Sequence, residues 1–282
     1  MKKILILGIS SMIGNQLFDY LIKSRIPTFG TSRFIKKKKS NIFYYDPEVN
    51  FSHIQKLIKK IKPNIIINTI GVIKHRKEIN NFYRTIYINS IFPHRLAQVI
   101  INTKIKLIHL STDCVFSGQK GNYSETDIPD SDDLYGISKS LGEIKYKNCL
   151  TIRTSFIGFE NKNKNGFLEW ILNNKNKTIN GFSKAFYNGL TTLEISKKIL
   201  KIINLGLPIN GLFHLSSQKI SKYDLILLII KKFNLKKELI KDNSFYCDRT
   251  LNSELIKKKL KLTVPGWEKM IDEMVNIYEA KK

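Results

Sequence analysis

The sequence predicts an α/β protein built on a doubly wound parallel sheet. Short apolar runs typical of buried strands alternate with helical stretches, and they lie at residues 3–7, 64–69, 105–110 and 149–153. A turn with two glycines follows the first run, and polar residues follow the third. Because open parallel sheets bind ligands at the carboxyl ends of their strands, this pattern predicts a binding site along that edge.

The other elements follow from the same patterns. Two more strands are predicted at 27–31 and 41–45, and a later one at 211–215. Helices are expected where apolar residues recur with helical spacing. They are residues 13–24, 53–61, 83–100, 192–203, 223–233, 253–260 and 267–278. The C-terminal third therefore reads as helical.

Length and composition are those of a globular protein. The 282 residues, of which 42% are hydrophobic, can form one large α/β domain or a cofactor domain with a smaller lobe. The apolar run at 225–230 is too short to cross a bilayer, and no cleavage site follows Lys2 and Lys3. We expect a cytoplasmic protein without a membrane partner.

Three scattered cysteines, Cys114, Cys149 and Cys247, have neither a paired nor a metal-binding spacing. No disulfide framework and no metal site are therefore predicted. Cys114 falls inside the central motif, where a packing role is favoured over a reactive one.

The chain is strongly basic, with 48 Lys and Arg against 23 Asp and Glu, or +25. The lysines are spread along the whole chain and are not interleaved with aromatic residues as in RNA-binding proteins. We therefore expect no nucleic-acid partner. A positive field would instead attract anionic cofactors and substrates.

The turn after the first strand has the features of a phosphate cradle. Gly8 and Gly14 allow close backbone approach, and the following helix offers free N–H groups. Ser11 lies midway between them; its hydroxyl could bond a phosphate, but its Cβ narrows the approach. The second strand ends at Ser32 and Arg33, without an acidic residue for a ribose hydroxyl.

The central motif spans residues 111–143. Ser111, Thr112 and Asp113 follow the third run, and Tyr135 and Lys139 are four residues apart, so phenol and ammonium share one helix face. A nearby cation lowers the tyrosine pKa from its usual value of about 10. Thr112 or Ser111 could then bond a carbonyl oxygen that Tyr135 protonates. The alternative is an amphipathic pair with no chemistry.

The Ser-Thr-Asp triplet and the string Tyr-Gly-Ile-Ser-Lys-Ser-Leu-Gly-Glu at 135–143 resemble the extended short-chain dehydrogenase/reductase superfamily. Within it, the chain is most similar to the dTDP-4-dehydrorhamnose reductase-like proteins, over nearly its full length. In that family, three glycines stand where this chain has Gly8, Ser11 and Gly14. The resemblance implies a Rossmann domain with a nicotinamide cofactor and a smaller, mostly helical substrate lobe.

This resemblance implies specific site residues. Asp46 would contact adenine or act as a turn residue before Pro47, and Asn89 would hold a water near the lysine or have no role. Thr112, Tyr135 and Lys139 would be catalytic. The cofactor would be bound by Gly8, Ser10, Ser11, Met12, Ile13, Gly14, Ser32, Arg33, Asp46, Thr69, Ile70, Gly71, Asn89, Ser111, Tyr135 and Lys139.

The substrate would be a nucleotide sugar bound by Thr112, Asp113, Lys74 and Arg249. Arg249 would contact the diphosphate or be a surface residue. For Lys74 and the adjacent His75 and Arg76, solvent exposure is the favoured interpretation. The cofactor domain would comprise 1–157 with 191–217, and the substrate lobe 158–190 with 218–282.

The implied reaction is reduction of a 4-keto-6-deoxyhexose nucleotide. NADP(H) is the expected cofactor because of Arg33 and the basic residues 36–39, and NAD(H) remains possible. Alternatives are an epimerase or dehydratase of the superfamily, or a regulatory subunit that binds cofactor without turnover. Tyr135 and Lys139 argue against the last, and a homodimer is left open.

Overall fold

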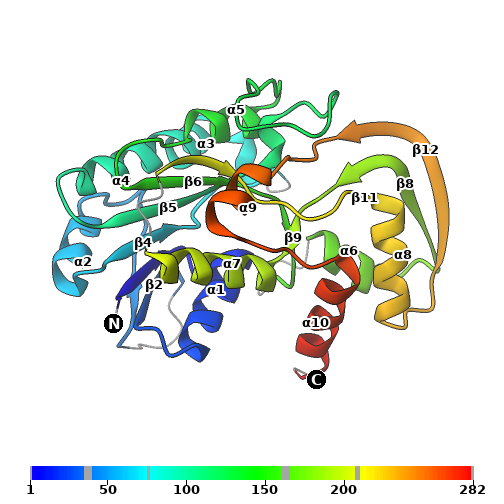
Figure 1. Cartoon of the computed structure of the whole chain (residues 1–282), viewed down its shortest axis with the longest axis horizontal. Helices are drawn as coiled ribbons and strands as arrows, with labels where there is room; N and C mark the ends of the chain where they lie inside the picture. The colour runs from blue at the N-terminus through cyan, green and yellow to red at the C-terminus, as the bar shows by residue number, and fades with distance from the viewer. Residues whose placement is uncertain (1, 35–39, 75–76, 161–165, 207–209, 281–282) are drawn as a thin grey trace.

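The computed structural model describes residues 2–34, 40–74, 77–160, 166–206 and 210–280. Its centre is a seven-stranded sheet, parallel throughout, in the order β10-β6-β5-β4-β1-β2-β3 (Figure 1). The strands are β1 (Ile4–Leu7), β2 (Thr28–Ser32), β3 (Ile42–Tyr44), β4 (Ile65–Asn68), β5 (Lys106–Ser111), β6 (Cys149–Arg153) and β10 (Gly211–His214). The predicted doubly wound sheet is confirmed.

Helices cover both faces of this sheet because its strands alternate their side chains between two cores. In β1, Ile4 and Ile6 pack on the side of α1 (Met12–Lys23) and α7 (Thr192–Leu205). Leu5 and Leu7 pack on the side of α2 (His53–Ile61) and α4 (Phe92–Ile100). Strand order reverses beside β1, so the crevice at its carboxyl end is a topological switch point.

The segment predicted as one helix at 83–100 is divided. It consists of α3 (Phe82–Ile86), a π-helical segment η2 (Tyr87–Ile91) and α4, in which Pro93 occupies the first turn. Proline lacks an N–H and its ring displaces the preceding turn, which accounts for the widened helix before it. Short 3-10 turns lie at η1 (Lys77–Asn80) and η3 (Asp113–Val115), and the motif helix is α5 (Leu134–Leu141).

The smaller lobe combines helices with a second sheet (Figure 1). The predicted C-terminal helices are present as α8 (Lys222–Lys232), α9 (Glu254–Leu260) and α10 (Trp267–Glu279). The expectation of a mostly helical lobe missed two long parallel strands, β8 (Thr178–Tyr187) and β12 (Glu238–Asp248). The remaining elements are α6 (Phe167–Asn173), β11 (Ile220–Ser221), and the two-stranded pair β7 (Phe156–Ile157) and β9 (Leu190–Thr191).

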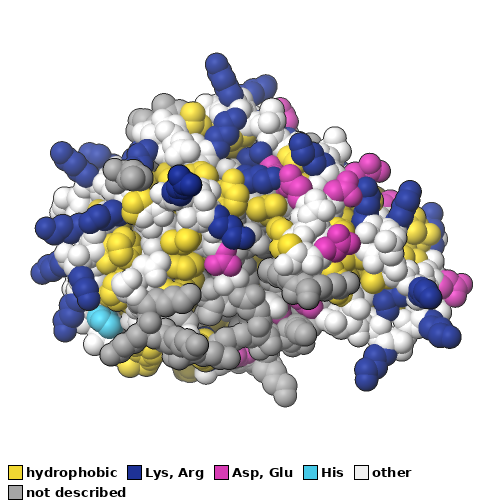
Figure 2. Space-filling view, turned by 90° about the horizontal axis from the view of Figure 1, so that it is seen from below, with side chains coloured by type: hydrophobic (Ala, Val, Ile, Leu, Met, Phe, Trp, Pro, Cys, Tyr) yellow, Lys and Arg dark blue, Asp and Glu magenta, His cyan; other side chains and the backbone are white. Residues whose placement is uncertain are grey.

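Basic side chains are dispersed over the face shown in Figure 2, where lysines and arginines ring the outline and do not form one patch. This distribution agrees with the spread of lysines along the sequence. Within the described part of the chain, no helix is long and apolar enough to cross a membrane.

Candidate active site

The turn between β1 and α1 is built by close contacts that only glycine allows. Gly8 has φ +90°, where side chains are strained, and a Cβ on Gly14 would lie 2.3 Å from the carbonyl oxygen of Gly8. The first N–H groups of α1, those of Met12 and Ile13, bond no other described residue. Such a turn with free N–H groups suits a pyrophosphate.

Ser11 has a local role in this turn. Its Oγ accepts a hydrogen bond from Gly14 N at 3.0 Å and donates to Gly8 O at 2.9 Å, so it is the N-cap of α1. Thr69 closes the turn from the end of β4 by donating to Leu7 O at 2.7 Å. The hydroxyl that could have bound a phosphate is thus used within the protein.

Two carboxylates from another segment lie near the end of β2, where the sequence itself has no acidic residue. Arg33 lies 3.8 Å from Asp46 and 3.4 Å from Glu48, measured between charged atoms. Asp46 also accepts from Glu48 N, as a turn residue does, and Ser32 bonds the backbone of Phe34. Arg33 therefore has two carboxylate neighbours, which the sequence at the end of β2 did not predict. The basic residues 36–39 lie outside the described residues.

Asn89 connects three segments beside the site. From the π-helical segment η2, its Oδ1 accepts from Val72 N at 2.8 Å, and its Nδ2 donates to Val72 O and to Ser138 Oγ. A Cβ on Gly71 would lie 3.4 Å from its Oδ1. The Asn89 amide thus joins the loop after β4 to α5. Neither interpretation of Asn89 from the sequence included this role.

Thr112 and Asp113 lie directly after β5, as predicted. Thr112 Oγ1 donates to Asp113 Oδ1 at 3.1 Å and accepts from Cys114 N. Asp113 is buried, and burial raises its pKa, while Arg249 and Lys222 act to lower it. Burial also raises the pKa of the Cys114 thiol, to about 12, which keeps it protonated and agrees with a packing role.

Tyr135 and Lys139 both lie on α5, whose N-cap is Asp133. Lys139 is buried and donates from Nζ to Leu110 O at 2.7 Å; burial lowers its pKa to about 8, opposed by Glu143. Burial raises the pKa of Tyr135, and the Thr112 hydroxyl acts to lower it. Lys139 does not contribute to this pKa, although it was expected to lower it; its ammonium donates to the β5 carbonyl.

A buried network behind this pair was not predicted. Arg153 bonds Glu143 through Nε and Nη2, both at 2.7 Å, and Ser111 donates to the same carboxylate at 2.8 Å. His214 contacts Arg153 Nη1 at 3.2 Å and Tyr123 O at 3.0 Å. The hydroxyl of Ser111 is thus bonded to Glu143, as that of Thr112 is bonded to Asp113. The signal in the sequence was Glu143 itself, four residues after Lys139.

The predicted substrate residues lie around Asp113. Arg249 donates from Nε to Phe116 O at 2.7 Å and is electrostatically coupled to Asp113. Lys74 pairs with Asp133, the N-cap of α5, at 2.6 Å. His75 and Arg76 lie outside the described residues. Arg249 is thus bonded to the segment after β5, and Lys74 to the start of α5.

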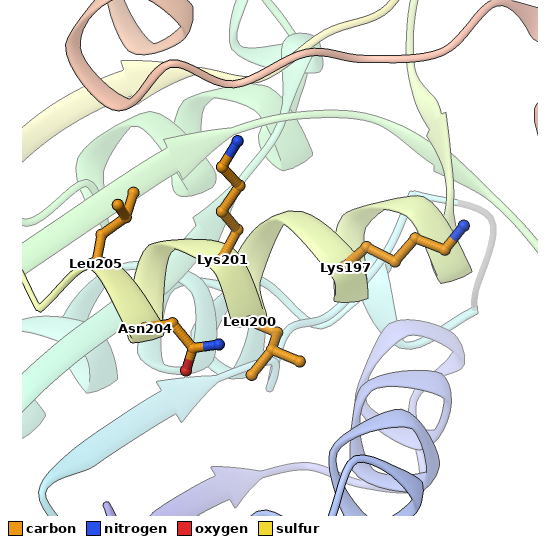
Figure 3. Close-up of a pocket in the computed structure, with 5 residues that line it drawn as sticks. All are labelled: Lys197, Leu200, Lys201, Asn204 and Leu205. Atoms are coloured by element: carbon orange, nitrogen blue, oxygen red, sulfur yellow. The ribbon is translucent and has the colours of Figure 1, made fainter.

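Two hollows lie elsewhere and share no residue with this site. One of about 380 Å³ is formed along α7 by Lys197, Leu200, Lys201, Asn204 and Leu205 (Figure 3). The other, of about 220 Å³, lies at the amino edge of the sheet near Asn64, Lys106 and Asn148. The residue chemistry at the carboxyl edge, not these hollows, marks the candidate active site.

Known proteins with similar sequences include enzymes and proteins of polysaccharide biosynthesis. The chain is 27% identical over 258 residues to a dTDP-4-dehydrorhamnose reductase of Aggregatibacter actinomycetemcomitans, covering 85% of this chain and 82% of that protein. It is 26% identical over 254 residues to the spore coat polysaccharide biosynthesis protein SpsK of Bacillus subtilis, with the same coverage of both chains.

Solved structures of similar proteins share the fold of this chain. A dTDP-4-dehydrorhamnose reductase from Bacillus anthracis, crystallised with NADP, has a TM-score of 0.82 at 20% identity and covers 98% of this chain and 99% of its own. A hypothetical dTDP-4-dehydrorhamnose reductase from Sulfolobus tokodaii has a TM-score of 0.78 at 26% identity, covering 93% and 97%. The family described as RmlD substrate binding domain matches residues 1–280. The chain belongs to this family of extended short-chain dehydrogenase/reductase proteins.

Proposed function

We propose that the protein is an NAD(P)H-dependent reductase of a 4-keto-6-deoxyhexose nucleotide, acting in deoxysugar or surface polysaccharide biosynthesis. The observation that carries the proposal is the placement of Tyr135 and Lys139 on α5, with the Lys139 ammonium bonded to Leu110 O of β5 and Thr112 directly after that strand. A dTDP-4-dehydrorhamnose reductase and a spore coat polysaccharide biosynthesis protein among its relatives support it.

The glycine turn fits a dinucleotide. Gly8 and Gly14 remove the Cβ atoms that would block the turn, and α1 presents free N–H groups at Met12 and Ile13. A bound NAD(P)H would supply hydride to the substrate carbonyl. Met12, Ile13 and the turn would hold the pyrophosphate, and Thr69 would keep the turn closed.

Residues of this chain would then supply the proton to the substrate carbonyl oxygen. The hydroxyl of Thr112, which donates to Asp113 in this structure, would turn its O–H to the carbonyl oxygen and orient it. Tyr135 would hold at Oη the proton that this oxygen takes up. The raised pKa of Tyr135 keeps the phenol protonated at neutral pH, as an acid requires. Lys139, charged at neutral pH and fixed by Leu110 O, would contact the ribose of the cofactor.

The proposal is tested by turnover. We expect the purified protein to oxidise NADPH when given dTDP-4-keto-6-deoxyhexose, with the reduced sugar nucleotide identified by mass spectrometry. A regulatory subunit would bind the cofactor without consuming it. A protein that binds NADPH but leaves all 4-keto sugar nucleotides unreduced would contradict the proposal.

The residue after Asp113 argues against a dehydratase activity. Elimination of water needs an acid and a base in addition to the tyrosine, whereas Asp113 is followed here by Cys114. Burial raises the pKa of this thiol to about 12, so it cannot serve as an acid of carboxylic strength. We expect no 4-keto-6-deoxy product from a nucleoside-diphosphate hexose.

Three finer points belong to the same proposal. NADP(H) is preferred through Arg33, with NAD(H) as a second cofactor. The three cysteines are free, which fits a cytoplasmic location. A homodimer would cover apolar side chains that η2 and α5 expose at Ile91, Ile137 and Leu141.

A further inference from the structure

A buried ion pair joins the end of α5 to the large sheet. Glu143 follows the C-terminal end of α5, and Arg153 is the last residue of β6, the neighbour of β5 (Figure 1). Two guanidinium nitrogens each lie 2.7 Å from a different carboxylate oxygen, so the pair is bidentate. The Glu143 side chain is 4% exposed and that of Arg153 is 2% exposed. Both charges are therefore removed from solvent.

Other segments of the large domain hold this pair from different sides. Ser111, at the end of β5, donates to the Glu143 carboxylate at 2.8 Å. The third guanidinium nitrogen of Arg153 lies 3.2 Å from Nε2 of His214 on β10. The guanidinium carbon lies 5.0 Å from the ring centre of Phe116, directly after η3. The pair is thus fixed in position by three segments besides its own.

A glycine at the end of α5 brings Glu143 to the sheet. A Cβ on Gly142 would lie 1.8 Å from the carbonyl oxygen of Asn89, so only glycine lets α5 end this close to η2. The N–H of Gly142 bonds Lys139 O, and the N–H of Glu143 bonds Ser140 O. The path of the chain from Lys139 to Glu143 is therefore closely defined.

Two consecutive residues of β5 hold two residues of α5 and its end that are four apart. Leu110 O accepts from Lys139 Nζ at 2.7 Å, and the next residue, Ser111, bonds Glu143. Thr112 comes directly after them. The ammonium that would contact the cofactor and the hydroxyl that would orient the carbonyl are thus adjacent in the chain or in the helix to the Glu143 contact.

Stability alone explains a buried ion pair poorly. Removing two charges from water is costly, and their mutual attraction only roughly offsets this cost, so apolar residues of similar size are often as stable. Directional bonds from such a pair do, however, define positions. We propose that Glu143 and Arg153 are positioning residues that fix Lys139 and the end of β5 relative to each other. Their effect on turnover rests on the proposed reductase function.

The charge of Lys139 gives a measurable signal of this arrangement. Burial lowers the pKa of Lys139 to about 8, and Glu143 acts to raise it. On β5, His109 is neutral because burial lowers its pKa well below the usual value, with Lys139 adding to the shift. Asp113 of η3 acts on the pKa of Tyr135 and not on that of Lys139. Loss of the Glu143 charge should therefore lower the pKa of Lys139 further.

The test is Glu143→Gln, which keeps the shape of the side chain but removes its charge. NADPH affinity is measured by fluorescence from about pH 7 to about pH 10, the range in which lysines lose their proton. It should fall in a step as Lys139 is deprotonated, and Lys139→Met should lack this step. In Glu143→Gln the step should move to lower pH. With a 4-keto sugar nucleotide, kcat should fall about 10-fold to 100-fold, as small displacements of reacting groups cause.

Two further variants separate positioning from folding. Glu194 on α7 is also 2% exposed and pairs with Lys198, so Glu194→Gln breaks another buried carboxylate pair. It should lose stability in urea as Glu143→Gln does, but keep the parent's kcat and pH step. The double variant Glu143→Gln with Arg153→Met leaves neither charge unpaired. It should regain stability but keep the low kcat and the shifted step.

Either of two results would overturn the inference. One is a Glu143→Gln protein that loses stability like Glu194→Gln but keeps the parent's kcat and pH step. The other is a double variant with the parent's kcat and pH step, and this result decides the matter if Glu143→Gln does not fold. If the parent reduces no 4-keto sugar nucleotide but Glu143→Gln still shifts the NADPH step, the reductase assignment falls and the positioning role stands.

Discussion

Tyr135 is the residue whose loss should separate chemistry from binding. Tyr135→Phe removes the proton at Oη but keeps the ring that packs at the start of α5. We expect kcat to fall by about 10² to 10⁴, the usual contribution of a general acid. The Kd for NADPH, measured by fluorescence, should stay near that of the parent.

Lys139→Met serves as the comparison for this variant. Lys139 is proposed to contact the cofactor, so its loss should lower both turnover and NADPH affinity. A Tyr135→Phe protein with most of the parent's kcat would show that another group supplies the proton.

Arg33 should set the choice between the two nicotinamide cofactors. A charged hydrogen bond to the 2′-phosphate corresponds to a preference for NADPH of about 1 to 3 kcal/mol in kcat/KM. Arg33→Ala should remove most of it. Because Glu48 competes for the guanidinium at 3.4 Å, Glu48→Gln should increase the preference.

Steady-state kinetics with both cofactors measures this ratio in the parent and the two variants. Equal kcat/KM with NADH and NADPH in the parent would mean that Arg33 is occupied by Asp46 and Glu48 and does not reach the phosphate.

Helix α1 depends on Ser11 as its N-cap. Ser11→Ala removes the N-cap of α1 and should cost about 1 kcal/mol of unfolding free energy, as caps generally do, whereas Ser11→Gly should cost only a few tenths. Urea unfolding measures both. If Ser11→Ala is as stable as the parent, the bonds of Ser11 to Gly14 and Gly8 do not stabilise the protein.

Local sequence patterns predicted the strands of the large sheet. They did not predict strands that are formed by pairing between distant parts of the chain. The helix at 53–61 and the strand at 149–153 were predicted with the bounds that the structure has. Strands β8 and β12 were missed because each contains Gly, Asn, Asp or Lys, and their pairing joins residues about 60 positions apart, as in Thr178 with Glu238.

The same distinction applies to the candidate site. The motif identified Tyr135, Lys139 and Thr112, because their spacing is local to β5 and α5, and their roles stay predictions. The partners of Arg33 could not be predicted, since they depend on how β3 follows β2.

The oligomeric state of the whole molecule can be predicted from its exposed apolar side chains. Ile91, Ile137 and Leu141 are 46%, 42% and 58% exposed on the neighbouring segments η2 and α5. We expect light scattering to report a dimer, and Ile137→Glu to shift it toward monomer. As a control, Ile240→Glu, at a residue 48% exposed on β12, should leave the dimer intact.

The stability of the whole fold should weaken in mild acid because of its buried histidines. Burial lowers the pKa of His214 to about 4, with Arg153 contributing, and lowers that of His109 well below its usual value. Above pH 6.5 His214 is neutral whether the chain is folded or unfolded, so it contributes no pH dependence there. Between pH 6.5 and 4 the unfolded chain binds a proton that the native protein does not.

Stability therefore falls as pH falls through this window, and for His214 the loss reaches roughly 2 kcal/mol at pH 5. His214→Gln cannot take up that proton in either state. Urea unfolding at pH 7 and pH 5 should show the variant less stable than the parent at pH 7, since it loses contacts with Arg153 and Tyr123. The difference between them should narrow by about 2 kcal/mol at pH 5. If the difference is the same at both pH values, His214 is protonated in the native protein, and the Arg153–His214 contact does not hold it neutral.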